Sequence, residues 1–167
     1  MRKIKAKPIS YDSSHTRDRK NVTFIVIHNT GNDNDTAENN AKYFANSNIN
    51  ETGAHIFVDQ KGNIVKSIDL NRTAWAVGGN KYPTCSQTGG GKYYGVCTNY
   101  NSVSIELCDI VSKNPSWEMV RAIKKAIKYI RKYCPNAKTV IRHFDVTGKA
   151  CPVAFQDNTK WSFFKSI

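Results

Sequence analysis

A histidine and a cysteine stand at the two ends of one short polar segment in the last quarter of the chain. The segment reads TVIRHFDVTGKACP, with His143 after a β-branched run and Cys151 eight residues later. A third candidate, His28, ends the apolar run VTFIVIH. Imidazole nitrogen and thiolate sulfur are donors that zinc prefers, and three protein ligands leave a fourth position for water. Structural hydrogen bonding and nucleophilic thiol chemistry are the alternatives at this point.

The runs that carry the two histidines have the pattern of strands. Val22–His28 is nearly continuous in apolar and β-branched residues, which is typical of a strand covered on both faces. The segment KTVIRHFDV predicts a last strand that ends in His143. Residues 102–110, SVSIELCDI, predict another strand, whose alternation puts Glu106 on its polar face. Because open sheets place ligand sites at the carboxyl ends of strands, we expect both histidines at such an edge.

Other signals separate these strands and give the order β-α-β-β-loop-β-α-β. Asp35 with Glu38 resembles a capping box, and Ser116 is the expected N-cap of a long amphipathic helix. The expected elements are a helix over 35–46, a hairpin over 54–68 with its turn at 59–63, a glycine-rich loop over 71–101, a helix over 116–134, and a packed aromatic end, KWSFFKSI. This order predicts a single α/β domain with helices on a mixed sheet.

Composition limits the classes of partner. The 167 residues correspond to about one domain, and 25 Lys and Arg against 13 Asp and Glu give a net charge of +12. An anionic partner is therefore expected, and nucleic acid, anionic lipid and an acidic wall polymer all fit. The basic residues form modest clusters at Arg2–Lys7, Arg17–Lys20 and Lys124–Lys132, for which an ordinary solvated surface is the alternative. No apolar run predicts a membrane span or a signal peptide.

The five cysteines are an odd number and include no C-x-x-C pair. This pattern favours neither a disulfide framework nor a zinc ribbon. Cys85 and Cys97 flank the glycine-rich stretch, and their spacing is compatible with a disulfide and equally with two free thiols.

Several of these stretches, taken in order, resemble a known family. VIHNT, AHIFVDQKGNIV, AWAVGG, SVSIELC and RHFDVTGKACP, between Val22 and Cys151, are similar to motifs of the zinc-dependent N-acetylmuramoyl-L-alanine amidases of the amidase-2 type. That family includes phage endolysins, autolysins and peptidoglycan recognition proteins. The resemblance implies one zinc ion held by His28, His143 and Cys151. It also implies a catalytic domain over residues 1–167, with a motif-bearing core over 22–152.

Two further positions match the catalytic pattern of the endolysin and autolysin branch. Glu106 corresponds to the family's catalytic glutamate and Lys149 to its catalytic lysine. A carboxylate beside zinc can take a proton from the attacking water, and a lysine ammonium can stabilise the oxyanion. Without the resemblance, an ion-paired strand residue and an ordinary loop lysine would be the favoured interpretations.

The chain departs from the family pattern in two places. Many relatives have a tyrosine where this chain has Ala54, so any role of that tyrosine has no carrier here. The adjacent His55 is expected to support the site by hydrogen bonding. The loop from Asn80 to Asn99 is longer than in compact relatives, and we expect it to shape the substrate groove.

These features together predict an enzyme that cleaves the amide between N-acetylmuramic acid and L-alanine in bacterial peptidoglycan. We expect an endolysin of a phage or prophage, held in the host cytoplasm until a holin-type pore releases it to the wall. The alternatives are a non-catalytic peptidoglycan-binding module of the same fold and a cytoplasmic muropeptide-recycling amidase. The anionic wall is the expected electrostatic partner, with no specific nucleic acid and no membrane. A monomer is expected, although the sequence leaves the oligomeric state open.

Overall fold

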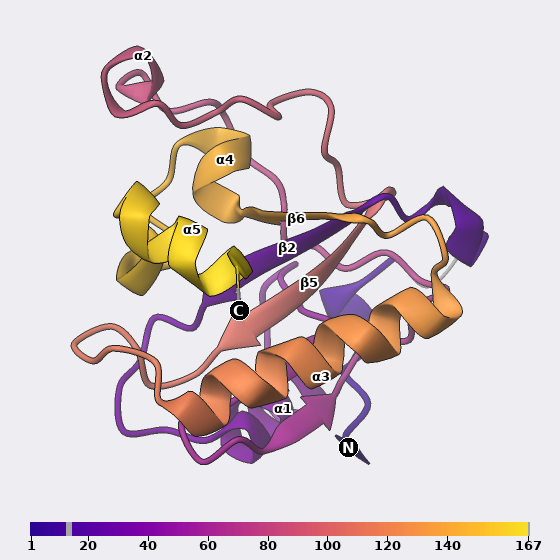
Figure 1. The fold of residues 1–167 in the computed structure, drawn as a ribbon. Helices are drawn as coiled ribbons and strands as arrows, with labels where there is room; N and C mark the ends of the chain where they lie inside the picture. Colours follow the sequence, from indigo (N-terminus) through magenta and orange to yellow (C-terminus); the bar gives the residue numbers. More distant parts are fainter. Residues whose placement is uncertain (13–14, 167) are drawn as a thin grey trace.

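The fold is a mixed six-stranded sheet with helices on both faces (Figure 1). The computed structural model describes residues 1–12 and 15–166. The strands, in spatial order across the sheet, are β1 (Arg2–Lys3), β4 (Ile64–Lys66), β3 (Ile56–Val58), β5 (Ser102–Leu107), β2 (Phe24–Asn29) and β6 (Thr139–Arg142). Neighbouring strands are parallel except for the antiparallel pair β3 and β4. The prediction of an α/β domain with a mixed sheet is confirmed.

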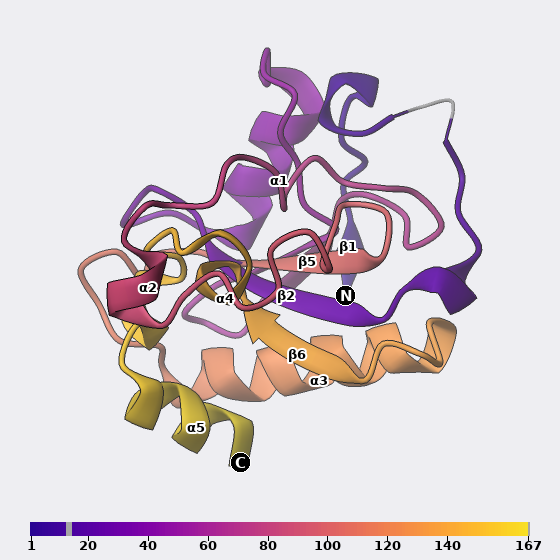
Figure 2. The same cartoon turned by 90° about the horizontal axis from the view of Figure 1, so that it is seen from above.

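The longer helices lie on opposite sides of the sheet. The helices are α1 (Ala37–Asn46), α2 (Cys85–Thr88), α3 (Trp117–Tyr133), α4 (His143–Thr147) and α5 (Asn158–Ser166), with 3-10 turns at Pro8–Ser10, Arg19–Asn21 and Val153–Phe155. Figure 2, which looks along the sheet, places α1 on one side of it and α3 on the other. Among the described residues, no helix combines the length and apolar character needed to cross a membrane.

The main core lies between the sheet and α3. Alternate residues of β2 and β5, such as Ile25, Ile27 and Ile105, are fully buried against the apolar stripe of α3. Ser116 caps α3, because its side chain accepts a hydrogen bond from the backbone N–H of Met119 at 3.0 Å. Trp161 and Phe164 of α5 also join this core, as predicted, whereas Phe163 is exposed; the last residue, Ile167, lies outside the described residues.

The other face of the sheet carries the polar residues of interest. On this face, Ala37 and Ala41 of α1 pack against Phe57 of β3. His28 of β2 is paired in register with Glu106 of β5, two strands that run parallel. Because side chains alternate along a strand, these two residues share the face opposite the α3 core. This face therefore positions the candidate site.

Three local predictions need correction. The N-cap of α1 is Thr36, not Asp35, because the Thr36 hydroxyl accepts from the backbone N–H of Asn39 while Asp35 binds side-chain amides. The last strand ends at Arg142, so His143 is the first residue of α4 and not the end of a strand. The glycine-rich stretch contains the short helix α2.

The structure answers the question of a disulfide between Cys85 and Cys97. All five cysteines are free thiols, so Cys85 and Cys97 are not bridged. The Cys85 thiol donates instead to the carbonyl of Thr147 at 3.3 Å.

The turn of the predicted β3–β4 hairpin uses Gly62, whose φ of 79° lies in the left-handed region that favours glycine.

Candidate metal centre

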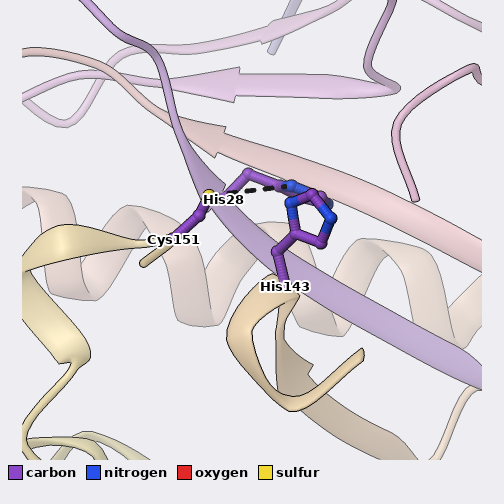
Figure 3. A group of neighbouring side chains, drawn as sticks. All are labelled: His28, His143 and Cys151. Atoms are coloured by element: carbon purple, nitrogen blue, oxygen red, sulfur yellow. Dashed lines mark hydrogen bonds between the residues drawn. The ribbon is translucent and has the colours of Figure 1, made fainter. Parts of the chain in front are cut away.

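Three donor side chains from three separate segments converge at one point (Figure 3). His28 comes from near the end of β2, His143 opens α4, and Cys151 lies in the loop after α4. Their candidate ligand atoms all lie within 4.8 Å of one another. The Cys151 Sγ is 3.9 Å from the Nδ1 of His28, and the centroids of the two imidazole rings are 4.7 Å apart. The structure thus brings together the three residues that the sequence singled out as metal ligands.

The state of these side chains fits a metal centre. All three are buried, and the Nε2 atoms of His28 and His143 have no hydrogen-bond partner among the described residues. Burial, reinforced by the neighbouring charges of His143 and Lys149, lowers the pKa of His28 far below its usual value. Burial likewise lowers the pKa of His143 to about 4. Both imidazoles are therefore neutral near pH 7, with a lone pair available for a cation.

The thiol fits the same interpretation and not that of a free nucleophile. Burial, with a further contribution from Glu106, raises the pKa of Cys151 to about 12. A thiol with such a pKa is protonated near neutrality and is a poor nucleophile. A bound metal ion would replace this proton, because a coordinating thiol is deprotonated. Two imidazole nitrogens and one sulfur form a donor set that zinc accepts, with a fourth position open for water.

Asn29, the residue after His28, links the candidate ligands His28 and Cys151. Its backbone N–H donates to the Cys151 Sγ at 3.4 Å. Its side-chain Oδ1 accepts from the backbone N–H of Val153 at 2.9 Å, beyond the cysteine. These two contacts hold the Cys151 loop from both sides and fix the sulfur against the end of β2.

The short helix α4 is held by groups at its start. The guanidinium of Arg142 and the carboxylate of Asp145 form a buried ion pair at 2.6 Å, and the Asp145 carboxylate also accepts from the Arg142 backbone N–H at 2.8 Å. The backbone N–H of Phe144 donates to the carbonyl of Cys151 at 2.8 Å. The two ends of the TVIRHFDVTGKACP segment therefore meet, which places His143 beside Cys151.

Glu106 and Lys149, the two predicted catalytic residues, lie next to this centre. The Oε2 of Glu106 is buried without a hydrogen-bond partner among the described residues. Burial raises the pKa of Glu106 to about 7, and the nearby charge of Lys149 opposes that rise. Lys149 is exposed and lines the same cleft as His143. The carboxyl group thus has the burial expected of a group that transfers protons near pH 7.

Two clefts open beside the metal centre. One, of about 420 Å³, runs toward α1 and is lined by residues 29–32, Asp35, Asn40, the aromatic pair Tyr43 and Phe44, and Glu106. The other, of about 400 Å³, is lined by residues 78–83 together with His143, Thr147 and Lys149. Glu106 faces one cleft and Lys149 the other. A substrate that occupied both clefts would cross the centre between these two side chains.

His55 and Arg17 support the sheet and contribute no metal ligand. The His55 Nδ1 accepts from the backbone N–H of Ser104 at 3.1 Å, so its Nε2 carries the proton and donates to the carbonyl of Arg72 at 3.0 Å. The guanidinium of Arg17 lies 2.9 Å from this Nε2 and is only 4% exposed. It donates to the carbonyls of Leu70, Asn99, Tyr100 and Ser102. Arg17 is therefore a buried hydrogen-bond donor that joins backbone segments, and not part of a solvated basic cluster.

The sequence analysis singled out the candidate donors but not the residues that orient them. Asn29 and Arg142 directly follow and precede a candidate ligand, and that adjacency was the available signal. The spacing of Arg142 and Asp145, three residues apart, would also have suggested a capped turn.

Known proteins resemble this chain in both fold and sequence. The solved structure of PlyL superposes with a TM-score of 0.73 and 26% identity, over 99% of this chain and 94% of that one. The PlyG catalytic domain gives a TM-score of 0.66 and 30% identity, over 98% and 89% of the two chains. Two Bacillus subtilis (strain 168) proteins, the N-acetylmuramoyl-L-alanine amidases CwlA and XlyB, are 30% and 28% identical over 83% and 86% of this chain. The match covers only 46% and 41% of those two relatives, so this chain spans less than half of their length. The profile of the family described as N-acetylmuramoyl-L-alanine amidase matches residues 18–154.

Proposed function

Because this chain belongs to the N-acetylmuramoyl-L-alanine amidase family, we propose that it is a zinc-dependent amidase of bacterial peptidoglycan. The bond cleaved is the amide between the lactyl group of N-acetylmuramic acid and L-alanine of the stem peptide. The observation that carries this proposal is the convergence of His28, His143 and Cys151 within 4.8 Å, beside the buried carboxyl group of Glu106. The catalytic domain comprises residues 1–167, with its motif-bearing core over 22–152.

The three ligands and Glu106 have distinct roles in this proposal. His28, His143 and Cys151 would hold one zinc ion, which would supply a Lewis acid for the scissile carbonyl and lower the pKa of a water molecule. Glu106 takes the proton from the attacking water and returns it to the leaving amine of L-alanine. Its position in register with His28 supports this role, because both side chains leave the same face of neighbouring strands.

Lys149 and the clefts orient and stabilise the substrate. The ammonium of Lys149, in the cleft that His143 also lines, stabilises the oxyanion that develops on the attacked carbonyl. The muramyl side and the peptide side of the substrate occupy the two clefts, so that the amide lies between Glu106 and Lys149. Glu106→Gln keeps the shape of the site but removes the proton acceptor. We expect it to lower turnover by about 10²–10⁴-fold while the bound zinc stays at one equivalent.

The matched control for this variant is Glu118→Gln, which alters an exposed carboxylate on α3, on the opposite face of the sheet. It should leave turnover unchanged. Mass analysis of the muropeptides released from purified sacculi then identifies the bond. Release of fragments cut at any bond other than the muramyl amide, or full activity of Glu106→Gln, would contradict the proposal.

The metal assignment has its own test. Cys151→Ser should lower zinc affinity at least tenfold, because a serine hydroxyl is a much poorer zinc donor than a thiolate. Cys85→Ser is the matched control, since Cys85 is also a buried thiol but only donates to a carbonyl. Competition with a chelator measures both affinities. Equal zinc affinities for the two variants would remove Cys151 from the ligand set.

We also infer that the protein acts on the wall as a phage or prophage endolysin, as a monomer that a holin-type pore releases from the host cytoplasm. The net charge of +12 supports an anionic wall as its partner. A muropeptide-recycling amidase would instead prefer soluble fragments, and a binding module would bind sacculi without cutting them. Rates on intact sacculi and on soluble muropeptides, measured side by side, separate these three functions.

A further inference from the structure

A further concave surface lies on the α3 side of the sheet, away from the candidate metal centre. It is a hollow of about 220 Å³ between α3, β6 and α5. Its floor is apolar and its rim is cationic, and we call it the basic groove. The residues of the basic groove are Ile127, Val140 and Phe164 on the floor and Lys124, Arg131, Lys138 and Lys165 on the rim. Val140 is paired in register with Ile25, a residue of the α3 core, so this groove and the metal centre lie on opposite faces of the sheet.

The rim cations have no acidic partner in the part of the chain that the structure describes, since none of the four forms an ion pair with a carboxylate there. The single acidic residue of α3, Glu118, is at the other end of the helix and pairs with Arg121 at 2.8 Å. Burial, with a smaller contribution from the neighbouring charge of Arg131, lowers the pKa of Lys124. An anion in the groove would relieve this repulsion.

Several of the rim side chains are held in place. The Nζ of Lys124 lies 5.0 Å from the centroid of the Phe164 ring, and that of Lys165 lies 5.5 Å from the centroid of Trp161. The guanidinium of Arg131 donates to the carbonyls of Ala137 and Lys138 at 3.2 and 2.9 Å. These contacts order the cations before any ligand arrives, which lowers the entropy lost on binding.

We propose that the basic groove binds a phosphodiester polymer of the cell wall, a chain of polyol phosphates, and so holds the enzyme on the wall with its metal centre free. This proposal rests on the proposed function, which places the protein at the wall. The lysines act as point charges for successive phosphates. Val140, the least buried residue of the floor, contacts the carbon atoms between them.

Two other polyanions fit the groove less well. Single-stranded nucleic acid is usually bound with exposed aromatic rings on which bases stack, but the ring in the groove, Phe164, is only 2% exposed. An anionic bilayer presents a broad surface, whereas the cations here surround a hollow. Both remain outcomes of the test.

The test uses two triple variants of equal charge. The groove variant is Lys124→Gln, Lys138→Gln and Lys165→Gln; the control variant is Lys5→Gln, Lys7→Gln and Lys61→Gln. The control lysines are exposed and lie near the β1–β4 edge, at the far side of the sheet from β6. Arg131 is left intact because it binds two carbonyls. Since both variants lose three charges, long-range electrostatics change equally.

The first measurement is calorimetric titration with a synthetic poly(glycerol phosphate). At about twofold per exposed ion pair, we expect the Kd of the groove variant to rise about tenfold and that of the control variant to change less than threefold. Polymer binding by the groove variant should also depend less on salt concentration, because fewer counterions are released. An equal loss in both variants would overturn the proposal. The proposal would also be overturned if the wild-type protein bound a 20-nucleotide single strand, or vesicles with anionic lipid, more tightly than poly(glycerol phosphate).

The second measurement separates this proposal from the proposed function. Both variants should hydrolyse a soluble muramyl-L-alanyl peptide at the wild-type rate. On intact sacculi the groove variant alone should be slower, and on sacculi stripped of phosphate polymers all three proteins should be equal. A wild-type protein that binds the polymer but hydrolyses no muramyl peptide would reject the amidase function only. Equal retention of the wild-type protein on intact and stripped sacculi would reject the groove as a binding site for the phosphate polymer.

Discussion

Arg142 offers the sharpest test of how α4 is held in place. Its guanidinium pairs with Asp145 at 2.6 Å and donates to the carbonyl of Phe155 at 2.8 Å and to the side chain of Asn158 at 3.0 Å. The side chains of Arg142 and Asp145 are only 5% and 13% exposed. Arg142→Met keeps most of the side-chain volume and removes all of these contacts. Asp145 would then be a nearly buried carboxylate without its charge partner.

The expected cost follows from that burial. Removing one partner of a buried ion pair costs about 3–5 kcal/mol, and an unsatisfied buried carbonyl costs about 1–3 kcal/mol, without full additivity. We therefore expect Arg142→Met to lower the free energy of unfolding by about 4 kcal/mol. For a chain of this size, that loss lowers Tm by about 8–16 °C, at about 2–4 °C per kcal/mol.

The assay is urea denaturation of a double-mutant cycle formed by Arg142→Met, Asp145→Leu and their combination. The double variant should be more stable than Arg142→Met alone, because no unpaired charge is left, with a coupling energy of about 2 kcal/mol or more. Arg121→Met is the matched control. Its ion pair with Glu118 is 69% and 55% exposed, so the loss should stay below about 1 kcal/mol. The reasoning is refuted if Arg142→Met costs no more than this control.

Substitutions at three further residues test other supports of the fold and site. Arg17→Met leaves four carbonyls without their donor, so urea denaturation should show a loss of about 3–5 kcal/mol; a loss below about 1 kcal/mol would show that water replaces the guanidinium. Asn29→Ala removes the side-chain acceptor of the Val153 N–H but keeps the backbone contact with the Cys151 Sγ, so it should lower zinc affinity about tenfold, whereas Asn29→Asp, which keeps the acceptor for Val153, should lose less. Burial lowers the pKa of His55 from 6.5 to about 3, so the unfolded chain binds a proton there below pH 6.5 and the folded chain does not. Stability should therefore fall between pH 6 and 4 by up to about 1.4 kcal/mol per pH unit from this group, and His55→Gln should remove that part of the slope; an unchanged slope would contradict the assignment.

The sequence predicted the elements that have a strong periodic signal. The predicted ends of β2, β5 and α3 lie within about three residues of the observed ones. Burial imposes an unbroken apolar run on β2, alternation on β5, and apolar residues at steps of three and four on α3. His28, His143 and Cys151 were singled out as candidate ligands because each stands in an ordered motif. Their proximity was not visible, since His28 and Cys151 are 123 residues apart and meet only in the folded chain.

Elements without a periodic signal escaped prediction. The helix α4 has five residues and the strand β1 has two, which is too short for any apolar pattern to develop. Arg17 stands with Lys20 in a basic stretch, where charge alone suggests a solvated surface. Its burial depends on backbone carbonyls that lie more than 50 residues away, and these become acceptors only in the folded chain.

The register of β2 joins the stability of the core to the geometry of the metal centre. Ile27 packs in the α3 core, and the next residue, His28, points to the opposite face. A slip of one residue would put the imidazole into the core and the isoleucine at the centre. Parallel pairing on both sides, with β5 and with β6, prevents such a slip. His28 is therefore as rigid as the sheet, whereas Cys151 lies on a loop that depends on the contacts of Asn29, and this loop is where the loss of a bound metal should first loosen the site.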